Sequence, residues 1–329
     1  MNKKLNMAIA GVGRIGMTHI NTMKHAENVN LLAVVEPNEE LGRKVAEQFG
    51  CDYYKSIKEL AGRPDIEAVN ICVPEEYHLS ATIEAAEAGK HIMIEKPISK
   101  TFEEAEKMIA VCKKENVRLM VAHTCRFIKQ YRKIRNEMQA KKIGEFCQVS
   151  IRRFAPRTSM DYVKGRVSIL YYIAVHDIDA IQWVTGHKII SVFAKKIDKL
   201  NAYGEDALCI VFEFDNGACG TMDIGWNFPA AYPGGLTQID IVGSEGVLFY
   251  DMMKEGISEY IQKEVPVSHT NGFLDGKLVG AFADQQKHFA DAILNNEEFV
   301  VDVNDTAYSV KIIEAIIRSV ETGKCVEVN

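Results

Sequence analysis

The sequence predicts an α/β first half built on a parallel sheet, followed by an α+β second half with a large, mainly antiparallel sheet. In the first half, short apolar runs alternate with amphipathic stretches, as in strands joined by helical crossovers. From residue 146 onward, strand-like runs follow one another, and turn signals such as Asp215-Asn216-Gly217 join them. We therefore expect two domains, residues 1–123 and residues 124–329.

The composition limits the classes of protein that the chain can belong to. Its 329 residues, 47% apolar and 26% charged, suit a globular protein of about two domains. A formal net charge of -6 argues against nucleic-acid binding, which needs a basic face. We find no apolar span of about 18 residues and no leader-like segment, so we expect a cytoplasmic protein without membrane contact. The eight cysteines form no C-x-x-C pair, which predicts no metal site and mostly core positions.

The first strand leads into a glycine-rich turn. The apolar run 7–10 is followed by Gly11-Val12-Gly13-Arg14-Ile15-Gly16 and then by a helix-compatible stretch to about residue 26. In this setting the first glycine permits a tight turn, the second lets the backbone approach a pyrophosphate, and the third lets helix pack on strand. The helix N-terminus adds N–H donors and a positive dipole. This pattern predicts a dinucleotide-binding Rossmann domain whose loop contacts come from Gly11, Gly13, Arg14, Ile15 and Gly16.

The second strand, residues 31–35, ends in an acidic residue, Glu36. A carboxylate at this place accepts hydrogen bonds from the ribose hydroxyls and repels a 2′-phosphate. No arginine follows until Arg43. We therefore expect NAD rather than NADP as the cofactor. A strand-end glutamate that merely faces solvent is the alternative, and the correctly spaced glycines make it the weaker one.

The remaining elements of the first half continue the alternation. We expect strands at 53–54, 68–73, 92–94 and 117–122, and helices at 39–49, 75–88 and 101–116. Ser56 caps a brief helix, and Thr101 with Glu104 forms a capping box. Val73 ends one strand and His78 lies in the first turn of the next helix, so both are predicted beside the cofactor, although a lone helix histidine is more often structural.

Charged residues follow the last two strands of this half. Glu95 and Lys96 come where the strand 92–94 ends, and Pro97 stops its pairing. Ligands of open α/β sheets bind outside the carboxyl ends of the strands, so Glu95 and Lys96 are predicted at the site. Taken alone, an ordinary loop with a charge pair would be favoured. Arg126 follows the strand 117–122 and suits a carboxylate, a phosphate or Glu95; a structural ion pair is an equally good alternative.

The second half contains six predicted strands, two closing helices and a last short strand. The strands are 146–154, 189–197, 207–214, 218–224, 238–242 and 247–250; the helices are 279–294 and 305–322; the last strand is 325–328. A sheet of this size rarely leaves an apolar face in water, so we expect a homodimer or homotetramer formed through it.

A helix at 170–183 interrupts the strands and carries Tyr172 and His176 on one face. His176 suits acid–base chemistry, although a satisfied interior histidine would be the better interpretation from sequence alone.

Together these features resemble the family of glucose-fructose oxidoreductase, inositol dehydrogenase and MocA (Gfo/Idh/MocA) over essentially the whole chain. Glu95-Lys96-Pro97 is similar to the best-known mark of that family, and Gly11 to Gly16 to its nucleotide loop. The resemblance implies that Lys96 is the catalytic lysine, that His176 is the general base, and that the Lys96–Pro97 bond is cis. The pattern of the family's active-site helix has an aspartate four residues before the histidine, where this chain has Tyr172.

The resemblance implies an NAD-dependent oxidoreductase that acts on a secondary hydroxyl of a sugar, polyol or cyclitol. His176 would take the hydroxyl proton, Lys96 would donate to the same oxygen, and Tyr172 would shape the site or assist. Two alternatives remain: an NAD-dependent glycosidase with no net redox change, and a catalytically silent protein that senses NAD or a sugar.

Overall fold

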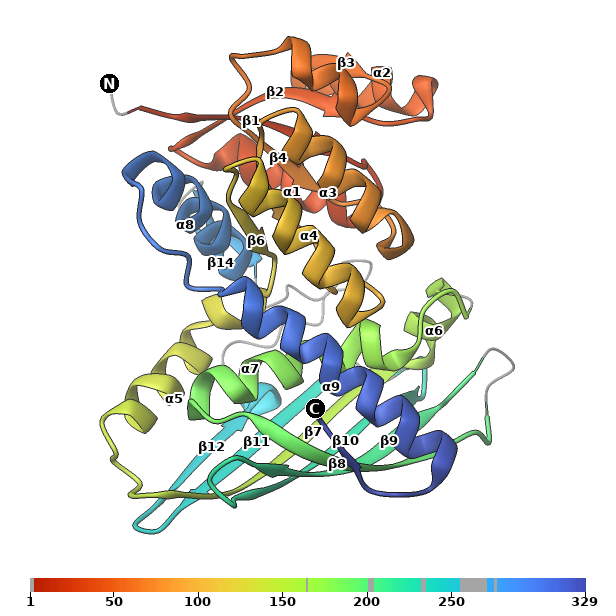
Figure 1. The fold of residues 1–329 in the computed structure, drawn as a ribbon, viewed down its shortest axis with the longest axis vertical. Coiled ribbons are helices and arrows are strands. Elements are labelled where there is room, and N and C mark those ends of the chain that lie inside the picture. Colours follow the sequence, from red (N-terminus) through yellow and green to blue (C-terminus); the bar gives the residue numbers. More distant parts are fainter. Residues whose placement is uncertain (1–2, 164, 201–203, 232–234, 255–270, 275–276) are drawn as a thin grey trace. The chain divides into compact units, whose positions relative to one another are not determined.

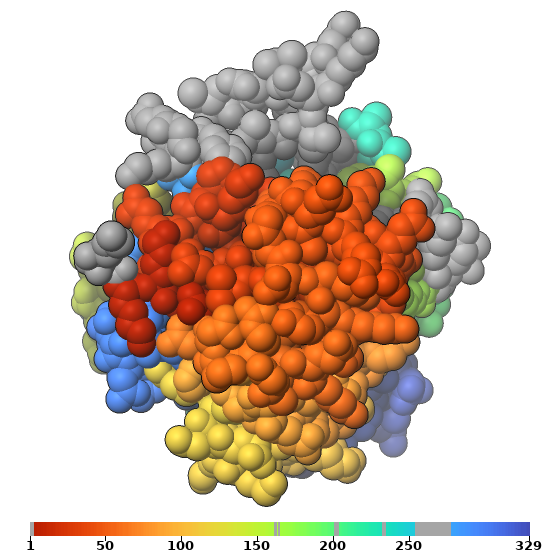
Figure 2. Space-filling view, turned by 90° about the horizontal axis from the view of Figure 1, so that it is seen from above, coloured from red at the N-terminus to blue at the C-terminus, as the bar shows by residue number. Residues whose placement is uncertain are grey.

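The computed structural model describes residues 3–163, 165–200, 204–231, 235–254, 271–274 and 277–329. The chain forms two compact units, one from Met1–Phe127 with Thr270–Val310, the other from Ile128–His269 with Lys311–Asn329. The first unit thus combines the N-terminal segment with a segment from far along the chain. Figure 2 looks onto the surface that the N-terminal segment, in red and orange, forms in the first unit.

The first unit contains the predicted parallel sheet. Its six strands have the order β3-β2-β1-β4-β5-β6, and every neighbouring pair is parallel. Their bounds are β1 (Leu5–Ala10), β2 (Val29–Val35), β3 (Asp52–Tyr54), β4 (Ala68–Ile71), β5 (His91–Ile94) and β6 (Leu119–Val121). The strand order reverses between β1 and β4, which is where open α/β sheets bind ligands. The α/β fold class predicted for this half is confirmed.

Helices and short helical turns connect these strands. They are α1 (Arg14–His25), α2 (Glu39–Phe49), η1 (Ile57–Gly62), η2 (Glu75–Tyr77), α3 (His78–Glu87), α4 (Phe102–Lys114) and η3 (Thr124–Phe127). The hairpin β13 (Asn271–Leu274) and β14 (Lys277–Gly280) and helix α8 (Ala281–Asn295) belong to the same unit. Helix α8 packs against α1 and β1 and so covers the same face of the sheet as α1.

Several predicted boundaries differ from the structure, each for a local reason. The predicted helix 75–88 begins as the 3-10 turn η2, and α3 starts only at His78. The predicted helix 279–294 starts at Ala281 because Val279 and Gly280 belong to β14, and Gly280, at φ +116°, is the N-cap residue of α8. Thr101 caps α4 as predicted, but Glu104 accepts from the backbone of Lys100, so the capping box is half formed.

The second unit is built on a seven-stranded sheet with the order β12-β11-β7-β10-β9-β8-β15. Its strands are β7 (Phe146–Pro156), β8 (Ile189–Ile197), β9 (Ala207–Phe214), β10 (Cys219–Phe228), β11 (Leu236–Gly243), β12 (Val247–Asp251) and β15 (Val326–Glu327). All neighbouring pairs are antiparallel except β7 and β10. The mainly antiparallel sheet predicted for the second half is therefore confirmed.

Besides α8, the helical elements in the described part of the chain from residue 128 onward are α5 (Lys129–Gln139), α6 (Arg157–Val163), the π-helical turn η4 (Leu170–Ala174), α7 (Val175–Thr185), the 3-10 turn η5 (Met252–Lys254) and α9 (Val303–Thr322). Helices α5 and α7 lie on one side of the sheet (Figure 1). Along β9, the residues Ile210, Phe212 and Phe214 are buried, whereas those between them are exposed. The sheet thus has one covered and one uncovered face.

The cysteine prediction was wrong for half of the cysteines. Cys72, Cys112 and Cys125 are buried and Cys51 is partly buried, whereas Cys147, Cys209, Cys219 and Cys325 are exposed. Cys209 and Cys219 lie in strands whose side chains alternate between the two faces of the second sheet. The apolar character of such a run does not tell which of its residues point outward.

A buried ion pair ties helix α7 to strand β7. Arg153 places Nε 2.7 Å from Oδ2 of Asp177 and donates from Nη2 to Oδ1 at 2.8 Å. The Asp177 side chain is fully buried, and the same guanidinium also donates to the hydroxyl of Tyr131 on α5. Burial raises the pKa of Asp177, and the charge and hydrogen bonds of Arg153 oppose that effect.

We expect Asp177→Ala to lower the free energy of unfolding by about 3–5 kcal/mol, because it leaves the Arg153 cation half-buried without its carboxylate. Chemical denaturation monitored by far-UV circular dichroism measures this loss. The double variant Arg153→Met/Asp177→Leu removes both charges and should cost clearly less. A single variant as stable as the unchanged protein would contradict a stabilising role of the pair.

Candidate functional site

The glycine-rich turn between β1 and α1 is packed so tightly that side chains are excluded at two positions. Gly11 has φ +88°, and a Cβ there would lie 2.7 Å from the carbonyl oxygen of Cys72. A Cβ at Gly16 would lie 2.0 Å from the carbonyl oxygen of Gly11. At Gly13, by contrast, a Cβ would meet nothing within 4 Å. The turn is therefore closed toward the sheet and open at Gly13, where the backbone precedes the N-terminus of α1.

Arg14 and Ile15 lie in the first turn of α1, which begins at Arg14. Arg14 is exposed and Ile15 is partly buried against the core cluster of Ile9 and Val12. The first N–H groups of a helix have no partner within the helix, so they and the helix dipole can receive an anion beside the turn. The open backbone and this helix end fit the diphosphate of a dinucleotide.

Glu36 lies at the end of β2 with its carboxylate fixed beside the turn. One oxygen accepts from the backbone N–H of Val12 at 3.3 Å, and the other accepts from that of Asn38 at 3.1 Å. The hydroxyl of Tyr53 donates to the carbonyl of Glu36 at 3.0 Å and holds the strand end. A carboxylate has about four lone-pair directions, so acceptor capacity remains for ribose hydroxyls. These residues fit NAD, as predicted from the sequence.

His78 joins the ends of β4 and β5 through backbone carbonyls. Its ring is buried, with Nδ1 2.8 Å from the carbonyl oxygen of Pro97 and 3.1 Å from that of Ile98. Nε2 lies 3.1 Å from the carbonyl oxygen of Val73. Burial lowers the pKa of His78, and the hydrogen bonds to these carbonyls oppose that effect. The contacts support an orienting role; contact of Val73 and His78 with the cofactor stays a prediction.

Glu95 and Lys96 end β5, and the Glu95 carboxylate is buried. One of its oxygens lies 2.7 Å from Nε2 of His19, and the other accepts from the backbone N–H of Lys96 at 3.1 Å. Burial alone would raise the pKa of Glu95, but its interactions with His19 and the charge of Lys96 more than offset this, so the pKa lies below its ordinary value. The Lys96–Pro97 bond is cis, as the resemblance implied.

Sequence reasoning missed His19. It lies 76 residues before Glu95, so no local pattern links the two. One signal was present: His19 follows Gly16 by three residues, which places it on the face of α1 that packs on the sheet. A histidine on an inward face needs a hydrogen-bonding partner, and the structure gives it the buried carboxylate.

Arg126 is buried in the turn η3, and its contacts favour the structural alternative left open by the sequence. Its Nη1 donates to the carbonyl of Val300 at 3.0 Å, and Nη2 lies 3.4 Å from a carboxylate oxygen of Asp305. The predicted contact of Arg126 with the cofactor has no support from these contacts and stays a prediction.

In the second unit, Tyr172 and His176 lie on either side of the junction between the π-helical turn η4 and α7. The continuous helix predicted over 170–183 is therefore wrong in its first turn. The carboxylate of Glu205 accepts from the backbone of Ile169 at 2.7 Å and from the hydroxyl of Ser168 at 2.5 Å, at the start of this turn. The Tyr172 ring lies 6.0 Å from that of Trp226, whose indole N–H donates to the carbonyl of Glu205. Both Tyr172 and His176 are partly exposed.

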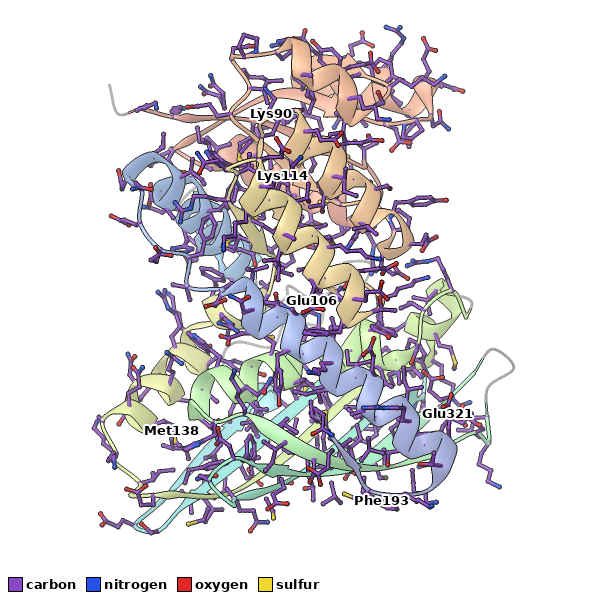
Figure 3. The ribbon with its side chains drawn as sticks, viewed as in Figure 1. Lys90, Glu106, Lys114, Met138, Phe193 and Glu321 are labelled. Carbon is purple, nitrogen blue, oxygen red and sulfur yellow. The ribbon has the colours of Figure 1, made fainter. Side chains whose placement is uncertain are left out.

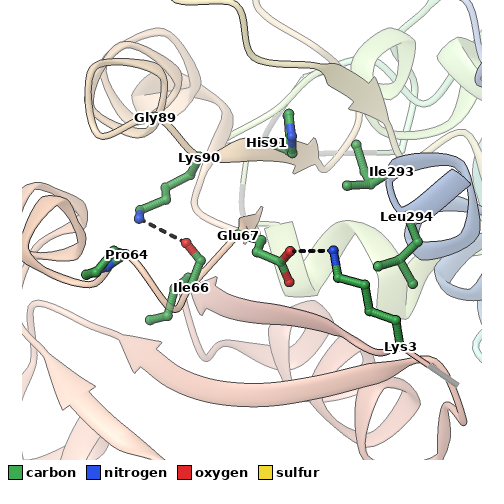
Figure 4. A pocket seen from close by; sticks show the side chains of 9 residues that line it. All are labelled: Lys3, Pro64, Ile66, Glu67, Gly89, Lys90, His91, Ile293 and Leu294. Atoms are coloured by element: carbon green, nitrogen blue, oxygen red, sulfur yellow. Dashed lines mark hydrogen bonds and ion pairs between the residues drawn. The ribbon is translucent and has the colours of Figure 1, made fainter. Parts of the chain in front are cut away.

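A cavity of about 470 Å³ lies at the opposite edge of the first sheet (Figure 4). It is lined by Lys3, Pro64, Ile66, Glu67, Gly89, Lys90, His91, Ile293 and Leu294. Lys3, Glu67 and Lys90 precede strands β1, β4 and β5, whereas the glycine-rich turn, Glu36 and Lys96 follow strands. The Lys90 ammonium donates to the carbonyls of Arg63 and Ile66. Binding of the nucleotide at the turn, and not in this cavity, stays a prediction.

Among the described residues, no three His, Cys, Asp or Glu side chains are grouped so that they could hold a metal ion. None of the helices in the described part of the chain has the length and apolar character needed to span a membrane.

The fold and the glycine-rich turn define a dinucleotide-binding oxidoreductase domain. Residues 5–123 match the family described as oxidoreductase family, NAD-binding Rossmann fold, and residues 131–249 match the GFO/IDH/MocA C-terminal domain. The chain belongs to the Gfo/Idh/MocA family of NAD-dependent oxidoreductases.

Individual relatives agree with this assignment. The chain is 28% identical to myo-inositol 2-dehydrogenase of Thermotoga maritima, over 76% of each chain. It is 26% identical to the uncharacterized oxidoreductase YrbE of Bacillus subtilis, over 100% of this chain and 98% of that protein. The structure of scyllo-inositol dehydrogenase of Lactobacillus casei, solved with NAD(H) and scyllo-inositol, has a TM-score of 0.85 at 20% identity and covers 99% of both chains. At this identity the structural likeness shows the fold.

We expect Glu36→Gln to weaken NAD binding by about tenfold to a hundredfold, because a charged acceptor for the ribose hydroxyls is lost. The NADP affinity should fall less, or rise, because the repulsion of a 2′-phosphate is also removed. Titration calorimetry with both nucleotides measures the change in preference. Glu39→Gln, an exposed glutamate at the start of α2, is the matched control. An unchanged ratio of the two dissociation constants would show that Glu36 does not select the cofactor.

Proposed function

We propose that this protein transfers a hydride between the nicotinamide of NAD and a carbon that bears a secondary hydroxyl in a sugar, polyol or cyclitol. The observation that carries this proposal is Lys96, placed at the carboxyl end of β5 by a buried and ionised Glu95 in an NAD-binding domain. Bound NAD supplies the hydride acceptor. The chain's own residues must then bind the alcohol and move its proton.

Lys96 and His176 are the residues we propose for that proton chemistry. An ammonium group can donate a hydrogen bond to the substrate oxygen and stabilise the negative charge that develops there. An imidazole is suited to take the hydroxyl proton near neutral pH. In reduction the same two groups act in reverse, with His176 returning the proton to the oxygen.

The substrate class rests on relatives and on the surroundings of Tyr172. Relatives that act on inositols include those of Thermotoga maritima and Rhizobium meliloti, at 28% and 26% identity. Here Tyr172, next to Trp226, stands where the family pattern has an aspartate. A tyrosine brings a hydroxyl and an aromatic ring instead of a charge. Its aromatic ring is better suited to contact the C–H face of a substrate ring than to contact a further substrate hydroxyl. We therefore propose a ring substrate that is bound with fewer charged contacts than an inositol.

Self-association through the second sheet is a further part of this proposal. On the uncovered face, the strand registers join Phe193, Val211, Thr221, Ser150, Asp240 and Phe249 into one row across six strands. Val211 is 49% exposed and Phe249 74% exposed; Phe193 is labelled in Figure 3. A row with apolar residues at both ends and polar residues at its centre is suited to pairing with a second copy.

We place the protein in the cytoplasm, where its eight free cysteines would stay reduced.

If this face joins two copies, Val211→Arg/Phe249→Arg should convert the dimer or tetramer to a smaller species. Light scattering during size-exclusion chromatography gives the mass directly. Leu41→Arg, which changes an exposed apolar residue of the first unit, should leave the mass unchanged. A monomeric mass for the unchanged protein would reject the proposed assembly.

The redox proposal is tested by the NADH absorbance of purified protein with NAD and a panel of aldoses, sugar acids, inositols and nucleotide sugars. A substrate-dependent rise is expected. Lys96→Ala should lower kcat by about 10²–10⁴-fold while the dissociation constant for NAD changes little, because Lys96 acts on the alcohol.

Two other results would overturn this proposal. Release of a leaving group from an aryl glycoside without net NADH formation would indicate an NAD-dependent glycosidase. Binding of NAD with no turnover of any compound would indicate a sensor. Equal losses in kcat and in NAD affinity for Lys96→Ala would reject the catalytic role of this lysine.

A further inference from the structure

His19 is buried on helix α1 and interacts with one side chain that belongs to the candidate site. Its Nε2 lies 2.7 Å from Oε1 of Glu95, and the His19 side chain is only 1% exposed. The ring packs at an edge-to-face angle against Phe282 of α8, with the ring centroids 5.4 Å apart. The imidazole is therefore held from two sides, by an aromatic ring and by a carboxylate.

The hydrogen on the imidazole can be placed from its surroundings. An ionised carboxylate only accepts hydrogen bonds, so Nε2 must donate to Glu95. Within the described residues, the buried Nδ1 has no hydrogen-bond partner. The ring is therefore fixed by its hydrogen bond to Glu95 through Nε2.

Both oxygens of Glu95 thereby accept a hydrogen bond within the domain. Oε1 accepts from His19, and Oε2 accepts from the backbone N–H of Lys96. These two bonds prevent the carboxylate from turning, and through Oε2 they fix the peptide from which the Lys96 side chain leaves the strand. They also keep a negative charge one residue away from the ammonium group.

We propose that His19 is a positioning residue for Lys96, acting through Glu95. The two hydrogen bonds of Glu95, from His19 and from the backbone N–H of Lys96, hold the lysine in place. This inference rests on the proposed function, since it assigns Lys96 the role of donor to the substrate oxygen. His19 itself is buried inside the domain, and its hydrogen bond is to Glu95. Contact of Glu95 with the cofactor stays a prediction beside this structural link.

Three variants test the link through turnover. His19→Leu removes the donor and should lower kcat by about 10²-fold, with the KM for NAD nearly unchanged, because the lysine is displaced while the nucleotide loop is intact. His19→Gln places an amide N–H near the position of Nε2 and should restore most of the lost turnover. His25→Leu, at the exposed end of the same helix, should have no effect.

A double-variant cycle shows whether His19 acts through Glu95. Glu95→Gln should lower kcat as His19→Leu does, and the combined variant should be no worse than either single one, since each breaks the same link. Multiplied losses would overturn the proposal, because they would mean that the two residues act independently. A loss in His19→Leu that appears in KM alone, or that His19→Gln does not reverse, would also overturn it.

A measurement without substrate separates this proposal from the proposed function. Without the His19 donor, the buried Glu95 takes up a proton more readily, and the Lys96 ammonium then loses its neighbouring anion. The acylation rate of Lys96, followed by peptide mass spectrometry at neutral pH, should rise in His19→Leu but not in His19→Gln, with exposed Lys107 as the internal reference. An unchanged rate would overturn the positioning role. A raised rate combined with full turnover of Lys96→Ala would uphold the link and reject the catalytic lysine.

Discussion

The close approach of two backbone segments, the turn at Gly11 and the carbonyl of Cys72 at the end of β4, is the constraint on which the first unit depends. No side chain fits at Gly11 or at Gly16, so α1 lies directly on the sheet. That contact places the N-terminus of α1 at the carboxyl edge of the sheet. It also fixes how close each residue of the helix lies to the sheet. The same contact therefore forms the cradle for a dinucleotide and brings His19 within reach of β5.

The elements that depend on local spacing could be predicted from the sequence. Gly11, Gly13 and Gly16 predict a nucleotide-binding turn because a strand precedes them and a helix follows. The strand, the glycines and the helix all lie within a short stretch of sequence. The place of Glu36 at the end of the second strand could be predicted because the βαβ unit has a nearly constant length. Alternation of apolar runs with amphipathic stretches was enough to predict the parallel sheet, and the turn at Asp215-Asn216-Gly217 was enough to predict the β9–β10 hairpin.

Features that depend on distant partners could not be predicted. Nothing near Glu95 indicates His19, and nothing near Arg126 indicates Val300 or Asp305, 174 and 179 residues away. The direction of the Arg126 guanidinium is decided by those partners and not by the end of the strand that precedes it. The hairpin of β13 and β14 and the widened turn at 170–174 also escaped, because short or irregular backbone leaves no periodic signal. Sequence thus located the strand ends, and tertiary contacts decided what each side chain does there.

The widened helical turn before α7 has a consequence for how Tyr172 and His176 are held in place. A π-helical turn holds one more residue than an α-helical turn, and here it ends at Ala174, just before the helix whose register Arg153 and Asp177 fix. Tyr172 lies inside this turn, whereas His176 lies on α7 beside Asp177, the residue that Arg153 holds. The place of His176 therefore depends on the ion pair, and that of Tyr172 on the irregular turn.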